Sequence, residues 1–152
     1  MRRIQIKSII QIIIASLFVL VANSCEDDQN SFVPYVKVSK YISLANYNDL
    51  YIPGNSVTFP GIGYSGIIVV CISESQYYAF DTCCPYEGLK SCYVELEPGK
   101  TGEIKSSKWT ATCKCCGSQY TISGGYPIKG PSGRNLKQYQ VSVLSDRLWV
   151  HN

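Results

Sequence analysis

Histidine and methionine are the residues that this 152-residue chain has least of. The only histidine is His151, and methionine occurs only at position 1. A Ser/His/Asp triad needs a histidine beside its nucleophile, and we expect His151 to lie far from every candidate nucleophile. No paired carboxylates flank an evident cleft either. The sequence therefore gives no support for hydrolysis or group transfer, and we expect a carrier or binding domain rather than a catalyst.

Charged residues are also few, at 16% of the chain, and their balance excludes one class of partner. The formal net charge is +3, and Arg2, Arg3 and Lys7 supply this whole excess. From Cys25 onward the basic and acidic residues are equal in number, at eleven each. Because no basic stripe remains, nucleic acid is not expected as a partner.

Residues 1–24 have the pattern of a leader rather than of a folded segment. A positively charged start, Met1–Lys7, precedes a stretch at 9–21 that is apolar except for Gln11 and Ser16. That length is typical of a signal peptide and is short for a bilayer span. We therefore expect a lipoprotein signal peptide over residues 1–24.

The end of this leader, Val21–Cys25, resembles a bacterial lipobox. The resemblance implies that Cys25 carries lipid and anchors the protein to the membrane in the cell envelope, either periplasmic or surface-exposed. Residues 25–31 then form an acidic tether. The acidic run at 26–28 resembles the surface-export signal of Bacteroidetes lipoproteins, and a plain solvated tether is an equal alternative. Disulfides are permitted in these compartments.

No segment shows a sustained helical period, whereas short β-prone runs are bounded by turn residues. The expected strands are 35–44, 57–59, 67–72, 76–80, 93–96, 103–105, 108–112, 119–122, 139–143 and 147–151. The run Ile67–Ile72 is the most apolar and predicts a buried central strand, with Cys71 as a core residue rather than a ligand. The pattern predicts a small antiparallel all-β domain over residues 32–152.

Two cysteine-bearing loops, 81–87 and 113–120, organise the rest of the chain. Each follows an expected strand, 76–80 and 108–112, and turns at small residues or proline, so that several sulfurs can point at one spot. The chain has eight cysteines, so seven remain besides Cys25, and at least one of these stays free or pairs in trans. The loops predict either a metal site or a disulfide-stapled tip.

A structural zinc site is one interpretation of these cysteines. Cys113 and Cys116 have the Cys-x-x-Cys spacing of a zinc knuckle, and Cys92 with either Cys83 or Cys84 would complete four thiolates. Two Cys-x-x-Cys motifs would be a strong signal for zinc. Cys83 and Cys84 do not form a second one, so the chain has half of that signal.

Three motifs follow one another in the second half of the chain. They are Cys84-Pro85-Tyr86, the Cys-x-x-Cys-Gly-Ser-x-Tyr of residues 113–120, and Gly130-Pro131, followed by a terminal hairpin. In these motifs and their order the chain resembles the Rieske iron–sulfur family. The likeness runs from about residue 35 to 151. It implies a small Rieske-like antiparallel β-sandwich with an inserted cluster-binding, rubredoxin-like subdomain at about 81–133.

The family binds its two-iron, two-sulfur cluster through Cys-x-His and Cys-x-x-His loops. Cys84 and Cys113 match the cysteine positions, but Tyr86 and Cys116 stand at the histidine positions, so true Rieske ligation is impossible within this chain. The resemblance implies a thiolate-rich 2Fe-2S centre held by Cys84, Cys113 and Cys116, with Tyr86 or Cys83 as the fourth ligand.

One-electron transfer to a redox partner in the cell envelope is the function that the resemblance implies. Thiolates in place of imidazoles add negative charge, so we expect a potential below the Rieske range and no pH dependence from ligand histidines. The resemblance also places Tyr86, Tyr120 and Tyr126 near the site. Gly130-Pro131 either covers the centre or is an ordinary turn.

A cluster-free domain is the alternative function. By resemblance to Rieske proteins of respiratory complexes, Cys115 would be bridged to Cys92. A further bridge from Cys84 to Cys113 or to Cys116 could then staple the tip, or zinc could do so. Such a disulfide- or zinc-stapled lipoprotein would act as a binding module of the cell envelope.

Overall fold

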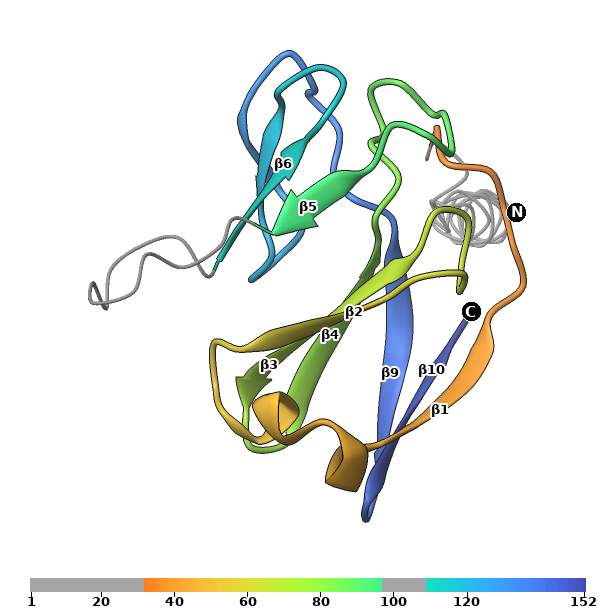
Figure 1. The fold of residues 1–152 in the computed structure, drawn as a ribbon, viewed down its shortest axis with the longest axis vertical. Coiled ribbons are helices and arrows are strands. Elements are labelled where there is room, and N and C mark those ends of the chain that lie inside the picture. Colours follow the sequence, from red (N-terminus) through yellow and green to blue (C-terminus); the bar gives the residue numbers. More distant parts are fainter. Residues whose placement is uncertain (1–31, 97–108) are drawn as a thin grey trace, which may run out of the picture. The chain divides into compact units, whose positions relative to one another are not determined.

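Short antiparallel strands make up nearly all of the regular structure in the computed structural model, which describes residues 32–96 and 109–152 (Figure 1). The strands are β1 (Ser39–Ser43), β2 (Ser56–Phe59), β3 (Ile67–Ser73), β4 (Gln76–Asp81), β5 (Val94–Leu96), β6 (Thr110–Cys113), β7 (Gln119–Thr121), β8 (Pro127–Lys129), β9 (Gln138–Leu144) and β10 (Arg147–His151). Helix in these residues is confined to two 3₁₀ turns, η1 (Leu44–Asn46) and η2 (Asn48–Tyr51). The all-β prediction is confirmed.

Three of the expectations fall outside the described residues. These are the signal peptide at 1–24, the tether at 25–31 with Cys25, and the strand at 103–105. The described residues all belong to one unit, Ser31–Asn152. No helix among them is long and apolar enough to cross a bilayer.

A six-stranded antiparallel sheet with the order β1-β10-β9-β4-β3-β2 forms the main body. β3 and β4 form one hairpin and β9 and β10 another, the second being the terminal hairpin that the sequence analysis expected. β4 pairs directly with β9, through Ala79 with Tyr139 and Phe80 with Gln138, although residues 82–137 lie between these strands in the chain. Those residues are therefore an insertion into the sheet.

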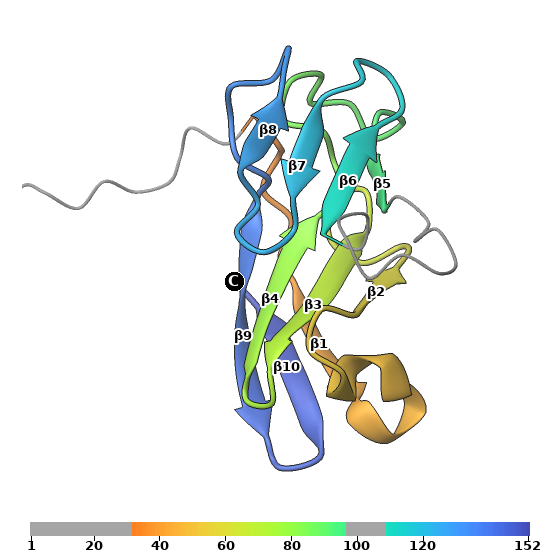
Figure 2. The same ribbon diagram turned by 90° about the vertical axis from the view of Figure 1, so that its left-hand side faces the viewer.

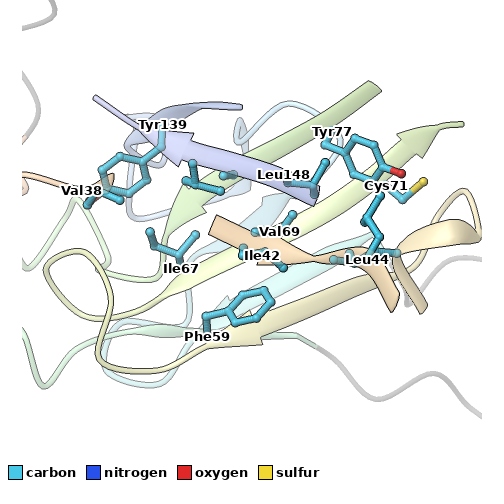
Figure 3. Packing of buried hydrophobic residues seen from close by; sticks show 13 residues of the cluster. Val38, Ile42, Leu44, Phe59, Ile67, Val69, Cys71, Tyr77, Tyr139 and Leu148 are labelled. Atoms are coloured by element: carbon cyan, nitrogen blue, oxygen red, sulfur yellow. The ribbon is translucent and has the colours of Figure 1, made fainter. Parts of the chain in front are cut away.

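The first hydrophobic core lies inside the curl of this sheet. Side chains from β1 and β10, such as Ile42 and Leu148, meet side chains from β2 and β3, such as Phe59 and Val69 (Figure 3). All four are nearly or completely buried. Cys71 is fully buried in this same cluster, as expected for a core cysteine.

The insertion carries a second, four-stranded antiparallel sheet with the order β5-β6-β7-β8, which lies at one end of the larger sheet (Figures 1 and 2). We call residues 82–137 the inserted subdomain. Within this sheet β5 pairs with β6, and Val94 lies opposite Cys113.

A second hydrophobic core joins the inserted subdomain to the outer face of β3 and β4. Ile68, Val70 and Phe80 point to that face and pack with subdomain residues that include Tyr120 and Ile122. Since alternate residues of a strand face opposite sides, β3 is buried on both. This explains why Ile67–Ile72 is continuously apolar rather than alternating.

Asp81 fixes the backbone where β4 passes into the first cysteine loop. Its buried carboxylate accepts hydrogen bonds from Tyr64 N at 2.7 Å, Ser65 N at 3.2 Å, Cys83 N at 2.8 Å and the Tyr139 hydroxyl at 2.8 Å. These four donors satisfy the hydrogen-bonding capacity of the buried carboxylate. Burial, followed by the Asp81 charge, raises the pKa of Tyr139, which therefore stays a donor.

Candidate metal centre

Three cysteine sulfurs from two loops converge at one point of the inserted subdomain. The Sγ atoms of Cys84, Cys113 and Cys116 all lie within 4.8 Å of one another. Those of Cys84 and Cys116 are 3.6 Å apart, although 32 positions separate the two residues in the chain. Cys84 is fully buried, Cys113 is 2% exposed and Cys116 is partly exposed. The structure thus brings together the three cysteines that the resemblance nominated as ligands.

The first loop turns back immediately after Cys84. The Cys84 amide donates to Cys92 O at 2.9 Å, and the Gly88 amide donates to Cys84 O at 2.9 Å. At Gly88 φ is +65°, and a Cβ would lie 2.8 Å from Phe32 Cδ1. Glycine alone meets both conditions, so this residue allows the loop to close tightly against the chain.

The second loop is a tight turn that begins at the end of β6. The Cys113 amide donates to Ser118 O at 2.8 Å, and the Gly117 amide donates to Cys113 O at 3.0 Å. Gly117 has a φ of +71°, which reverses the chain before β7. The turn therefore holds the sulfurs of Cys113 and Cys116 toward one side, where Cys84 meets them.

A disulfide between Cys92 and Cys115 ties the two loops together. This is the pairing that the resemblance implied. The Lys114 amide also donates to Tyr93 O at 3.2 Å, and Cys83 forms a β-bridge with Tyr93. The backbone that carries Cys84 is therefore linked both covalently and by hydrogen bonds to the backbone that carries Cys113 and Cys116.

Two hydroxyl groups contact the sulfurs directly. Ser118 Oγ lies 3.1 Å from Cys116 Sγ, and Tyr120 Oη lies 3.4 Å from Cys84 Sγ. Ser118 Oγ also accepts the Ser132 amide at 2.9 Å, which leaves its own proton for the Cys116 sulfur when that sulfur is ionised. Ser132 follows the cis Gly130-Pro131 bond, so this loop does reach the centre.

The protonation of the three groups around the centre differs because their surroundings differ. Burial raises the pKa of Cys113 to about 12. Partial burial also acts to raise the pKa of Cys116, but hydrogen bonds with Ser118 and with the neighbouring thiols outweigh it and lower this pKa below the ordinary thiol value. Burial raises the pKa of Tyr120, which therefore remains a neutral hydrogen-bond donor.

The two candidates for a fourth ligand, Cys83 and Tyr86, differ in their burial. The buried Cys83 thiol contacts Leu89 O at 3.6 Å. Among the described cysteines, histidines and carboxylates, the group that converges consists of Cys84, Cys113 and Cys116, without Cys83. Burial raises the pKa of Cys83 to about 11. Tyr86 is 51% exposed and Tyr126 is 59% exposed. The fourth ligand stays a prediction.

His151 belongs to a different part of the molecule. Its ring stacks on Trp149 with centroids 3.9 Å apart, and its Nε2 lies 3.3 Å from Ser142 Oγ. Both neighbours belong to the β9–β10 hairpin of the larger sheet.

Ser118 and Ser132 are the site residues whose roles the sequence analysis did not assign. Ser118 was part of the quoted Cys-Gly-Ser-x-Tyr motif, and a hydroxyl two residues after a cysteine in a tight turn was the available signal. Nothing in the sequence pattern pointed to Ser132, since its part depends on a contact across 14 residues.

The donor set fits a metal that prefers thiolate. With metal–sulfur bonds of about 2.3 Å, tetrahedral geometry separates two sulfurs on one ion by roughly 3.8 Å. The observed 3.6 Å between Cys84 and Cys116 is close to that spacing. Three thiols supply three of the four ligands that zinc or an iron–sulfur cluster takes.

Comparison with solved structures assigns the fold. The plasma membrane Rieske protein of the cyanobacterium Synechocystis PCC 6803 is 21% identical to this chain, the match covering 78% of this chain and 100% of that one with a TM-score of 0.51. The fold is of the Rieske type. The inserted subdomain and the two cysteine loops are thus parts of a Rieske-type fold, as the resemblance implied.

A second similar structure is the ferredoxin of carbazole 1,9a-dioxygenase from Nocardioides aromaticivorans IC177. It is 18% identical, covers 76% of this chain and 95% of its own, and has a TM-score of 0.46. No family model matches this chain, and no curated protein matches it significantly.

Proposed function

We propose that this protein transfers single electrons through a 2Fe-2S centre with thiolate-rich ligation by Cys84, Cys113 and Cys116. The observation that carries the proposal is the convergence of these three sulfurs from two loops on a Rieske-type fold. An iron–sulfur cluster, when bound, would supply one-electron redox chemistry.

The residues around the sulfurs have separate parts in this proposal. The Cys116 thiol donates to Ser118 Oγ at 3.1 Å, and Tyr120 Oη lies 3.4 Å from the Cys84 sulfur. Once these sulfurs are thiolates, both hydroxyls would donate to them and stabilise their negative charge. Burial of Cys84 and Cys113 limits the access of water. Cys83 or Tyr86 is the proposed fourth ligand, and Cys83 would first have to turn its thiol away from Leu89 O.

We further propose that the protein acts in the cell envelope, held to the membrane by lipid on Cys25, with a redox partner there. The sequence pattern of residues 1–31 supports this part of the proposal. The Cys92–Cys115 disulfide agrees with it, because disulfides persist in exported proteins and are rare in the cytosol.

Anaerobic reconstitution of the full-length protein with iron and sulfide tests the proposal. We expect bound iron and sulfide, visible absorbance that bleaches on reduction, and an EPR signal of the reduced form. The midpoint potential should lie below about −150 mV, the lower end of the Rieske range, and should not change with pH. Serine variants of Cys84, Cys113 and Cys116 should each lose iron, whereas Cys71→Ser, in the other core, should retain it. A colourless, iron-free wild-type protein would contradict the proposal.

A structural zinc site in a cluster-free envelope binding module is the second candidate. The 3.6 Å separation of the Cys84 and Cys116 sulfurs favours it, because that spacing suits a single tetrahedral ion. Metal analysis after growth with both metals decides between them: the second candidate predicts zinc without inorganic sulfide, and no redox activity.

A further inference from the structure

The two sulfurs that lie 3.6 Å apart are close enough for a second reaction besides binding metal. A disulfide places its sulfurs about 2 Å apart, so Cys84 and Cys116 need to approach by less than 2 Å. Their loops are already joined by the Cys92–Cys115 bridge and by the Lys114–Tyr93 hydrogen bond, which keep the two cysteines together. We infer that Cys84 and Cys116 form a reversible disulfide, and that this bond excludes metal from the centre.

The exposure of the three thiols sets the order of events. Cys116 is partly exposed, whereas Cys84 and Cys113 are buried. An oxidant in solution therefore reaches Cys116 first. The Cys84 sulfur then lies at 3.6 Å from it, in position to complete the bond from inside the protein. Partial exposure beside a second thiol is the arrangement that thiol–disulfide exchange requires.

The oxidant that we propose is a disulfide, either a small molecule or a partner protein. The Cys116 thiolate attacks one sulfur of R–S–S–R, forms a mixed disulfide and releases one R–S⁻. The Cys84 thiolate then attacks Cys116 Sγ, breaks the mixed disulfide and releases the second R–S⁻. In total, two protein thiols are oxidised to one disulfide, and one external disulfide is reduced to two thiols.

The bridged form has lost two of the three ligands of the candidate centre. Only the Cys113 thiol remains, and one thiolate does not hold zinc or iron in the manner of a three- or four-thiolate site. Metal binding and the bridge are therefore mutually exclusive. This last step rests on the proposed metal site, whereas formation of the bridge does not.

Peptide mapping of the metal-free, full-length protein tests the bridge. The protein is equilibrated in glutathione buffers of graded composition, then alkylated and digested without reduction. In oxidising buffer we expect a peptide linking Cys84 to Cys116, the loss of two alkylated thiols and a mass lower by about 2 Da. More reducing buffers should reverse this while Cys92–Cys115 persists. A wild-type protein with no such link, or with Cys113 linked to Cys116 instead, overturns the inference.

Variants identify the order of attack and provide the control. Cys84→Ser should leave Cys116 as a stable mixed disulfide with glutathione, and Cys116→Ser should form neither species at these positions. Cys113→Ser should still form the Cys84–Cys116 bridge. If Cys84→Ser shows no adduct on Cys116, or if Cys113→Ser forms no bridge, the proposed order is wrong.

Zinc serves as the probe for mutual exclusion. The reduced protein should bind Zn²⁺ and resist glutathione disulfide, and the bridged protein should not bind it. Zinc bound to the bridged form would overturn the exclusion. If neither form binds zinc or iron but the bridge forms, the proposed metal function fails and the switchable disulfide stands; if metal binds and no bridge ever forms, the reverse holds.

Discussion

The larger sheet and the inserted subdomain are stabilised in different ways. The larger sheet has strands of up to seven residues, and its core is almost entirely aliphatic and aromatic. The strands of the inserted subdomain have three or four residues, and three cysteines border its core. Short strands bury little surface of their own, so the subdomain depends on the disulfide and on the outer face of β3 and β4.

This difference shows how one fold can combine a stable body with an adaptable site. The larger sheet encloses its core within its own curl, and its cysteine, Cys71, forms no disulfide. The subdomain holds its sulfurs on two loops that the Cys92–Cys115 disulfide links, and of the three converging cysteines Cys116 is the partly exposed one. Substitutions at the converging cysteines should therefore leave the larger sheet intact.

Truncating the residue that joins the two regions should have the largest effect. Phe80 is fully buried, and a Cβ at Gly125 would lie 2.7 Å from its ring, so subdomain backbone packs against it. We expect Phe80→Ala to lower the free energy of unfolding by about 4 kcal/mol, as measured by urea denaturation. Tyr41→Ala, at a position 55% exposed, is the control and should cost less than about 1 kcal/mol. Equal effects of the two changes would contradict this account.

Removing the disulfide should affect the inserted subdomain alone. The bridge spans 23 positions, and the double change Cys92→Ser with Cys115→Ser should cost about 3 kcal/mol of subdomain stability. Hydrogen exchange should then quicken at β6 and β7, while β3 and β10 keep their protection. Loss of protection throughout both sheets would show that the larger sheet also depends on the bridge.

Weakening the Asp81 hydrogen bonds should have a moderate effect at the boundary between the regions. Tyr139→Phe removes one of four donors to a buried carboxylate, and we expect a loss of about 2 kcal/mol in thermal or urea unfolding. Tyr78→Phe removes only a hydroxyl that accepts from the exposed Gln76, so it should cost less than about 0.5 kcal/mol. If Tyr139→Phe left the free energy of unfolding unchanged, the three remaining donors would be enough to satisfy the Asp81 carboxylate.

The smallest effect should be a shift in the reactivity of one thiol. Since the pKa of Cys116 is lowered, in the reduced, metal-free protein this cysteine should react with iodoacetamide at lower pH than an ordinary thiol, and Cys113 should not react until far higher pH. Ser118→Ala removes a hydrogen bond to the thiolate, so the pH profile of Cys116 should move upward. Alkylation rates followed by mass spectrometry give this profile, and an unchanged or downward-shifted profile would exclude Ser118 as the cause.

The strand pattern of this chain was largely predictable because local signals and tertiary structure agree. The apolar run at 67–72 coincides with β3, and the expected terminal hairpin coincides with β9 and β10. The pairing of β5 with β6 was not predicted, because both strands are short and lie well apart in the chain. The first 3₁₀ turn, η1, begins at Leu44, the last residue of the predicted strand at 35–44, where the chain leaves the sheet edge.

The candidate site was only partly predictable. Loop pattern and resemblance together nominated Cys84, Cys113 and Cys116, and the structure brings them together. The orientation of Cys83 was harder to predict, because adjacent side chains point to opposite faces in an extended strand but not in a turn such as the one at Pro85. In the structure Cys83 turns toward Leu89 O. The contribution of Ser132 depends on tertiary packing that no local pattern reveals.

The double-sided burial of β3 has a consequence for how its alignment is chosen during folding. In a strand with one solvent-exposed face, a one-residue shift in register would expose its apolar side chains to water and is therefore strongly disfavoured. Ile67–Ile72 presents nearly the same apolar surface on both faces, so a one-residue shift in its register costs little free energy. The register must therefore be fixed at the two ends of β3. At one end the pairing with β4 is irregular between Cys71 and Ser73, and at the other Ile67 pairs with the hydrogen-bonded Asp81.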